Sequence, residues 1–154
     1  ELFELAPQLE EIIDKTYKPL IRSRGGLIDL KVEPGLTLEA DKLHFKNVIV
    51  NLLDNAIKYC KEVPEIHIEA SLDRDQIKIS IRDNGIGMSK ENLKNIFNKF
   101  YRIPTGNLHD VKGFGLGLSY VKLIIRQHGG DIKVQSELDK GSEFCIFIPQ
   151  IRKR

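Results

Sequence analysis

The sequence lacks an excess of charge of either sign and has no long apolar run. Its 154 residues carry 24 Lys and Arg against 22 Asp and Glu, so no broad basic surface indicates nucleic-acid binding. No apolar run approaches the roughly 18 residues that a membrane span needs, and the N-terminus lacks the pattern of a signal peptide. With 41% hydrophobic and 30% charged residues, the chain is predicted to be one soluble globular domain.

Cysteine is scarce, and two common phosphate-binding motifs are missing. Cys60 and Cys145 stand far apart without the spacing of metal ligands, so we expect free thiols in a reducing compartment, the cytosol. There is neither a G-x-x-x-x-G-K-[ST] loop nor a G-x-G-x-x-G that opens a βαβ unit, which disfavours Walker-type and dinucleotide folds. The chain does not begin with methionine, and we expect it to be a piece of a longer protein.

The order of apolar patterns predicts a mixture of helices and strands. Helical periods cover about 7–22, 42–60 and 115–128, with a short helix expected within 89–100. Strand patterns cover 2–5, 27–32, 36–39, 65–72, 76–82, 131–136 and 142–148, mostly joined as hairpins. Residues 101–114 show neither period, and a stretch of that length without structure is usually functional or disordered.

The helix predicted over 42–60 carries a stripe of polar side chains. On a helical wheel, Asn47, Asn51, Asn55 and Lys58 fall within roughly 80° of one another, with an apolar side opposite. Asparagine costs about half a kcal/mol relative to alanine in a helix, so three in one stripe need a reason. The stripe is either a solvated face or a row of amides facing a cleft, where a side-chain carbonyl completes the shell of a phosphate-bound Mg²⁺.

Two glycine-containing segments are candidates for ligand contact. The first, Asp83-Asn84-Gly85-Ile86-Gly87, follows a β-branched strand, and its glycines allow close approach of a ligand. Its carboxylate can accept a hydrogen bond from an exocyclic amine, although an ordinary turn explains the spacing equally well. The second, Gly113-Phe114-Gly115-Leu116-Gly117-Leu118, begins a helix, whose N–H groups form a natural anion site.

A third segment, Phe97-Asn98-Lys99-Phe100-Tyr101-Arg102, lies between the two glycine segments. Phe97 and Phe100 have helical spacing and are expected in the core. Arg102 could clamp a phosphate with its planar guanidinium group.

In this order and spacing, the motifs closely resemble those of the catalytic and ATP-binding domain of sensor histidine kinases, within the wider family that includes gyrase and heat-shock chaperone ATPases. The segment 51–59 resembles that family's N box, 83–87 and 113–117 its two glycine boxes, and 97–100 its F box. Lys140-Gly141-Ser142 with Phe144 resembles a smaller box near the C-terminus. The resemblance covers nearly the whole chain and implies that residues 1–154 form a single domain. The implied fold is an α/β two-layer sandwich of the Bergerat type, in which a mixed and mostly antiparallel sheet packs against three helices.

The resemblance also implies roles for single residues. Asn55 would hold Mg²⁺, Asn51 would support the phosphate side, and Lys58 and Arg102 would contact phosphate oxygens. Asp83 would read the adenine amine, and Tyr59 would lie against the nucleotide. The expected site residues are Asn51, Asn55, Lys58, Tyr59, Asp83, Gly85, Gly87, Arg102, Gly113, Gly115, Leu116, Gly117 and Leu118, with 101–114 as the ATP lid.

Two features depart from the family pattern. Phe114 stands where a small or polar residue is common, so it removes any side-chain bond to phosphate at that position. None of the four histidines lies in a context like S-H-E-[LF]-[RK]-x-P, the phospho-acceptor pattern of these kinases. We expect His44, His67 and His128 to be structural and His109 to be exposed in the lid.

The resemblance therefore implies that the chain binds Mg-ATP without containing its own nucleophile. The γ-phosphate would pass to a histidine of a dimerisation domain missing upstream, then to a response-regulator aspartate, in the cytoplasmic part of a membrane-anchored sensor. Three alternatives are a regulatory module that only binds nucleotide, a serine kinase of the anti-sigma type, and a gyrase-like or chaperone-like ATPase. The last needs a carboxylate base on the long helix, but Asp54 points about 100° away from Asn55 around the helix.

Overall fold

The structure, a computed structural model, describes residues 1–98 and 116–150, so the expected lid at 101–114 lies outside the described residues. The helical elements are α1 (Leu5–Ile12), a π-helical turn η1 (Ile13–Tyr17), α2 (Lys18–Ser23), α3 (Lys42–Lys58), α4 (Lys90–Asn95) and α5 (Leu116–Gln127). The strands are β1 (Leu2–Glu4), β2 (Leu27–Val32), β3 (Thr37–Glu39), β4 (Glu65–Asp73), β5 (Gln76–Asp83), β6 (Asp131–Glu137) and β7 (Gly141–Pro149).

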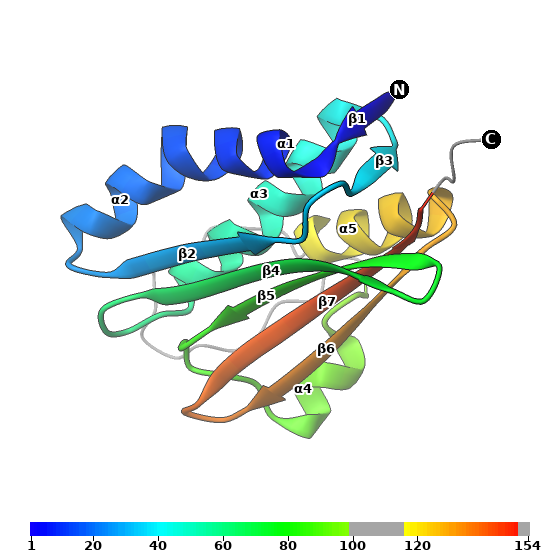
Figure 1. Cartoon of the computed structure of the whole chain (residues 1–154). Coiled ribbons are helices and arrows are strands. Elements are labelled where there is room, and N and C mark those ends of the chain that lie inside the picture. The colour runs from blue at the N-terminus through cyan, green and yellow to red at the C-terminus, as the bar shows by residue number, and fades with distance from the viewer. Residues whose placement is uncertain (99–115, 151–154) are drawn as a thin grey trace.

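These elements form two layers, a mixed sheet and the helices that cover one of its faces (Figure 1). The five-stranded sheet has the order β2-β4-β5-β7-β6, in which β2 and β4 are parallel and the other neighbours are antiparallel. The parallel pair is joined through α3, because parallel neighbours need a long crossover connection. β1 and β3 form a separate two-stranded sheet. The predicted sandwich is confirmed.

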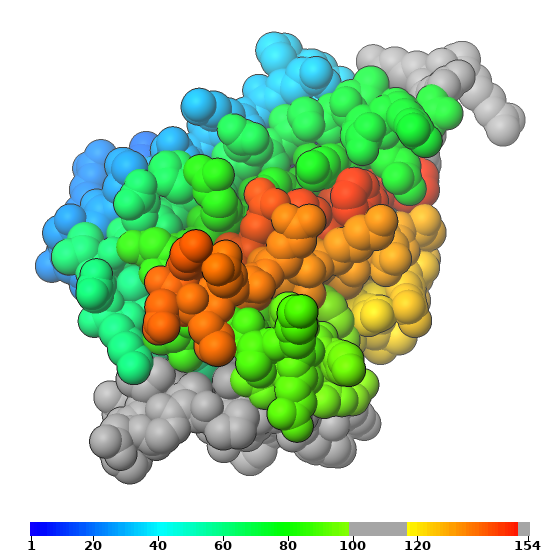
Figure 2. All heavy atoms as spheres, turned by 90° about the horizontal axis from the view of Figure 1, so that it is seen from below, coloured from blue at the N-terminus to red at the C-terminus, as the bar shows by residue number. Residues whose placement is uncertain are grey.

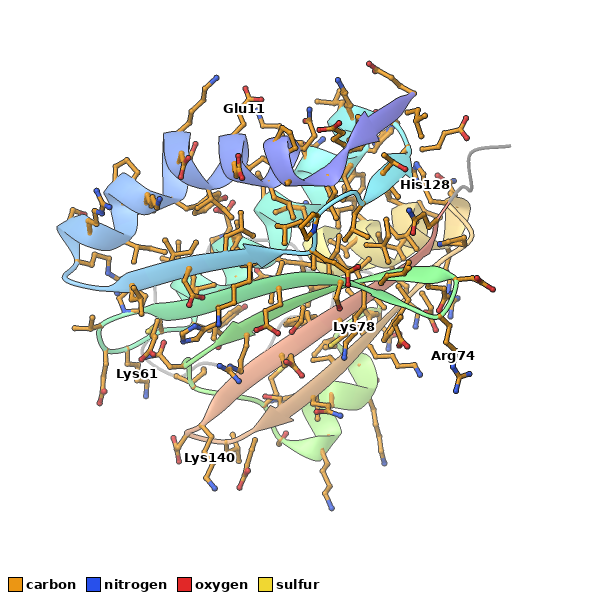
Figure 3. The ribbon with its side chains drawn as sticks, in the orientation of Figure 1. Glu11, Lys61, Arg74, Lys78, His128 and Lys140 are labelled. Carbon is orange, nitrogen blue, oxygen red and sulfur yellow. The ribbon has the colours of Figure 1, made fainter. Side chains whose placement is uncertain are left out.

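Alternation along the strands explains why the helices cover only one face. In β5, the isoleucines at 77, 79 and 81 are almost fully buried, while Lys78 and Ser80 lie on the other face with the polar residues of the neighbouring strands. Figure 3 shows Lys78 on this open side of the sheet. The core therefore lies between the sheet and the apolar sides of α1, α3 and α5.

The helix α3 begins and packs as its sequence predicts. Asp41 is the N-cap, and its carboxylate accepts a hydrogen bond from the His44 N–H at 2.9 Å. Leu52, Leu53 and Ala56 are buried on the apolar side. The helix ends at Lys58, two residues before the predicted end.

The first predicted helix, by contrast, is not continuous. A single helix from about residue 7 to 22 was predicted, but the π-helical turn η1 interrupts it, and the Lys18 N–H donates to the Ile13 carbonyl. Pro19 follows directly. A proline inside an α-helix removes one backbone hydrogen bond and its ring collides with the carbonyl four residues earlier. The wider turn relieves that collision, which is why the prediction was wrong here.

Candidate nucleotide-binding site

The polar stripe of α3 is turned toward the start of α5 and the loop after β5. Asn51 and Asn55 are half-buried on this side, whereas Lys58 is exposed in the last turn of the helix. The Asn51 side-chain amide donates to the Asn47 carbonyl at 2.8 Å, which leaves the Asn51 side-chain oxygen directed toward Gly117 of α5. A Cβ added at Gly117 would lie 3.0 Å from that oxygen. The glycine therefore allows the two helices to approach closely here.

The end of β5 holds a half-buried carboxylate, Asp83, in a fixed orientation. The Gly85 N–H donates to the Asp83 carboxylate at 2.8 Å, and the backbone N–H of Ser142 donates to it as well. Burial raises the pKa of Asp83 above its usual range, and these two hydrogen bonds oppose the increase. A carboxylate has about four acceptor positions, so Asp83 keeps capacity for a ligand donor.

The loop after β5 is attached to its neighbours by close backbone contacts. The Ile86 N–H donates to the Tyr59 carbonyl at 2.9 Å, and the Asp139 N–H donates to the Ile86 carbonyl at 2.8 Å. Gly87 has φ +69°, and a Cβ there would overlap the Glu137 carbonyl oxygen. This glycine is required by both its conformation and its surroundings. The loop is therefore a rigid wall formed against the end of α3 and the β6–β7 hairpin, whose tip carries Lys140 (Figure 3).

One cavity joins several of the predicted site residues. It is lined by Asn55, Tyr59, Asp83, Gly87 and Leu118, together with Ala56, Ile86, Met88, Ser142 and Phe144. Apolar walls with one carboxylate suit a flat heterocycle that carries an amine. Asn51 and Gly117 meet beside this cavity, whereas Lys58 does not line it.

Five of the residues that line the cavity were not among the predicted site residues: Ala56, Ile86, Met88, Ser142 and Phe144. Ser142 and Phe144 belong to the Lys140-Gly141-Ser142 box, so the sequence contained a signal for them. Ser142 also contacts the Ser136 hydroxyl at 2.7 Å, and Ser136 accepts the Met88 N–H at 2.8 Å. The sequence alone did not indicate that Ser136 lies next to Ser142, because their contact depends on the register of β6 against β7.

The remaining predicted residues fall outside the described part of the chain. These are Arg102, Gly113, Gly115, Phe100, Phe114 and His109. Leu116 begins α5. Phe97 packs edge-on against Phe144, with ring centroids 6.4 Å apart, as expected for a core residue of the F box.

The three described histidines have structural partners, as predicted. His44 contacts the Tyr120 hydroxyl at 2.7 Å, and His67 lies between the carboxylates of Asp29 and Glu65. His128 contacts the Ile124 carbonyl at 2.7 Å, and its other ring nitrogen lies 3.3 Å from the Asp41 N–H. Both cysteines are free thiols.

The donor groups of the site are compatible with a metal held mainly by a nucleotide. Within residues 1–98 and 116–150, no three His, Cys, Asp or Glu side chains come together as a metal cage. Asn55 lines the cavity and offers a neutral amide oxygen. Mg²⁺ bound to phosphates takes few protein ligands, all of them oxygen, so this residue fits.

None of the helices within residues 1–98 and 116–150 combines the length and the apolar composition that a membrane span requires.

Comparison with protein families and curated proteins agrees with this geometry. Residues 40–152 match the family described as histidine kinase-, DNA gyrase B- and HSP90-like ATPase. Sensor protein RprX of Bacteroides fragilis is 53% identical over 115 residues, which cover 73% of this chain and 22% of RprX. Sensor protein SrrB of Staphylococcus aureus is 38% identical over 114 residues, or 74% of this chain. The chain thus spans about a fifth of the length of these relatives.

Solved structures show the same fold. The nucleotide-free catalytic domain of histidine kinase ThkA superposes with a TM-score of 0.84 at 28% identity and covers 97% of both chains. Full-length ShkA in complex with AMPPNP superposes with a TM-score of 0.83 at 25% identity. The match covers 97% of this chain and 31% of the ShkA chain. ThkA in complex with the response regulator protein TrrA superposes with a TM-score of 0.76 at 26% identity. The match covers 98% of this chain and 42% of the matched chain.

Proposed function

The chain belongs to the family of histidine kinase-, DNA gyrase B- and HSP90-like ATPases, and from this premise we propose that it is the Mg-ATP-binding catalytic domain of a two-component sensor histidine kinase. The observation that carries the proposal is the cavity that joins Asn55 of α3, Asp83 at the end of β5 and Leu118 of α5. These residues come from three separate motifs that the sequence spaces far apart.

We assign adenine to this cavity. Its exocyclic amine donates to the Asp83 carboxylate, which the amides of Gly85 and Ser142 hold in place. Tyr59, Met88 and Leu118 supply walls for the ring. The AMPPNP complex of ShkA supports a nucleotide in a related fold.

The triphosphate then extends toward Asn51, Asn55 and the N-terminus of α5. Helix N-termini attract phosphate through their free N–H groups, and the glycines at 113, 115 and 117 permit close approach. Lys58 and Arg102 are the cations that we assign to phosphate oxygens, with 101–114 as the lid. Asn55 would hold Mg²⁺, which neutralises phosphate charge when it is bound.

The acceptor of the γ-phosphate is a histidine outside this chain. A ring nitrogen of that histidine attacks the γ-phosphorus. The bond between the γ-phosphorus and the β,γ-bridging oxygen breaks, and ADP leaves. We place that histidine on a dimerisation domain of the same protein and the next acceptor on a response-regulator aspartate. The ThkA–TrrA complex supports the second partner. We also propose a cytoplasmic location in a membrane-anchored sensor, because the relatives are sensor proteins.

The test replaces Asn55 and leaves the rest of the stripe intact. Asn55→Ala should abolish Mg-dependent ATP binding in calorimetry while the circular dichroism spectrum is retained, because the side-chain oxygen is lost. Asn47→Ala is the matched control, since Asn47 lies on the same stripe but does not line the cavity. Unchanged Mg-ATP affinity in Asn55→Ala would remove the magnesium assignment.

The alternatives are separated by the product. With the full-length protein and labelled ATP, an acid-labile phosphoprotein indicates phosphohistidine, whereas acid-stable label indicates a serine kinase. Steady release of phosphate without labelled protein would indicate an ATPase. Nucleotide binding with neither result would indicate a regulatory module.

A further inference from the structure

Asp54 is the only carboxylate on α3, and the proposed function gives it no role. It directly precedes Asn55, yet it is not among the residues that line the nucleotide cavity. Its carboxylate instead accepts a hydrogen bond from the Tyr17 hydroxyl at 2.8 Å. The partner comes from η1, 37 residues earlier in the chain.

The environment of Tyr17 makes this bond well defined. The residue is 2% exposed, and its hydroxyl also lies 3.4 Å from the Val50 carbonyl, one helical turn before Asp54. A phenol has one proton to donate, and the distances assign it mainly to Asp54. Burial and the Asp54 carboxylate raise the pKa of Tyr17 far above its usual range. The hydroxyl therefore remains a donor whenever the domain is folded.

The location of the bond is set by the interrupted first helix. The π-helical turn ends at Tyr17, and Pro19 prevents a regular α-helix through this region. Turns of this kind inside helices are often found at functional sites. Here the turn places the phenol against α3, where its hydroxyl meets Val50 and Asp54.

The bond supplies what apolar packing cannot. Burial of Leu52 and Leu53 holds α3 against the sheet, but hydrophobic burial is non-directional and tolerates small rotations. A rotation of about 20° would move an atom 5–6 Å from the helix axis by about 2 Å. Misplacement of about 1 Å in a catalytic site can cost about 100-fold in rate.

We infer that Tyr17 is a positioning residue for the nucleotide site. Its hydrogen bond to Asp54 fixes the rotation of α3 about its axis and thereby aims the Asn51 and Asn55 side chains at the phosphates and metal. The functional consequence rests on the proposed function, whereas the orientation of the two amides does not.

The first measurement uses the nucleotide-free chain. In Tyr17→Phe, the side-chain amide NMR signals of Asn51 and Asn55 should shift or broaden, while Tm remains high enough for a folded spectrum at 25 °C. Tyr120→Phe is the matched control, because the Tyr120 hydroxyl also binds α3, at His44 in the first turn. The Asn51 and Asn55 signals should remain unchanged in that variant.

The second measurement is Mg-ATP affinity by calorimetry. Tyr17→Phe should bind about tenfold more weakly or worse, and Tyr120→Phe within about twofold of the parent. Asp54→Asn keeps an oxygen that accepts from Tyr17 and should retain affinity, whereas Asp54→Ala should lose as much as Tyr17→Phe. This pair also covers the case in which Tyr17→Phe fails to fold.

The outcomes separate this inference from the proposed function. Parent-like amide signals and parent-like affinity in Tyr17→Phe would overturn it. Equal losses in Tyr17→Phe and Tyr120→Phe would also overturn it, because general loosening of α3 would then explain both. A parent that binds no Mg-ATP contradicts the proposed function, and the amide signals still decide the role of Tyr17.

Discussion

Asp83 combines partial burial with the proposed role of binding adenine, which needs its charge. Burial raises its pKa, although hydrogen bonds from the Gly85 and Ser142 amides favour the ionised form. Ionised Asp83 is therefore a cost to folding that is present at neutral pH and disappears as acid protonates the folded carboxyl. In the proposed role, the charge of Asp83 would thus favour adenine binding at the expense of stability.

This balance predicts a pH dependence of ATP affinity. Protonation removes the anionic acceptor, so affinity should fall as pH decreases through a pKa above the value of about 3.9 usual for aspartate. Asp83→Asn should prefer ATP over GTP less strongly than the parent. Its affinity should also change less between pH 7 and pH 4, measured by calorimetry in both proteins. Equal pH profiles would contradict the assignment of Asp83 to adenine.

Gly87 is a second position where one residue type is required. Alanine there would have φ +69° and a Cβ that overlaps the Glu137 carbonyl oxygen. Gly35 is a matched control, with φ +82° and no atom within 4 Å of an added Cβ. In urea denaturation, Gly35→Ala should lower the free energy of unfolding by about 1 kcal/mol and Gly87→Ala by at least about 3 kcal/mol. Similar losses would show that the Glu137 contact is easily relieved.

Among the elements, α3 is held at several points along its length. At its start, Asp41 accepts the His44 N–H, and His128 from the end of α5 lies against the Asp41 N–H (Figure 3). Farther along, Asp54 is bound by Tyr17 from η1. These hydrogen bonds lie at the start and near the end of the helix. The apolar side of α3 packs in the core along the length between them.

The N-cap of α3 should contribute to stability in a pH-dependent way. A hydrogen bond from the His44 N–H lowers the pKa of Asp41, so its contribution is present above the unfolded pKa and is lost as pH falls through the folded pKa. Asp41→Ala should lower Tm at pH 7, whereas Asp41→Asn, which can still cap, should remain close to the parent. The Tm difference for alanine should narrow under acid conditions. A constant difference would mean that ionisation of Asp41 is irrelevant.

At the scale of the whole molecule, the sheet has one covered and one open face. The helices cover one face of the sheet (Figure 1), and the apolar strand residues pack against them on that side. Lys78 lies on the other face (Figure 3). Figure 2 shows the molecule from below, with α4 and the β6–β7 hairpin next to each other. The candidate site therefore lies on the covered side, where residues of α3, α5, β5 and β7 line its cavity.

This arrangement predicts opposite tolerance on the two faces of β5. Ile79 is fully buried in the central strand, so Ile79→Ala should lower the free energy of unfolding by about 2–5 kcal/mol. Lys78 is its neighbour on the open face, and Lys78→Ala should change stability by less than about 0.5 kcal/mol. Chemical denaturation measures both. A large loss in Lys78→Ala would indicate that the open face contributes to folding.

Local patterns were sufficient for most elements and for several of the residues that line the cavity. Periodicity located α3, α5 and the strands to within about two residues, because burial of one face repeats at a spacing set by the backbone. The asparagines of α3 and the Asp83 loop were also found from residue type and spacing. Pro19 was the exception, since its effect depends on how the helix can yield around it.

Contacts between distant segments were decided only by the folded chain. Periodicity reports which face of an element is buried but not what covers it, so it could not predict the parallel pairing of β2 with β4. Nor could it bring Ser142 to Asp83, or Tyr17 to Asp54. Such contacts form only when the core packs, because each hydrogen bond between distant segments requires both elements to be in place.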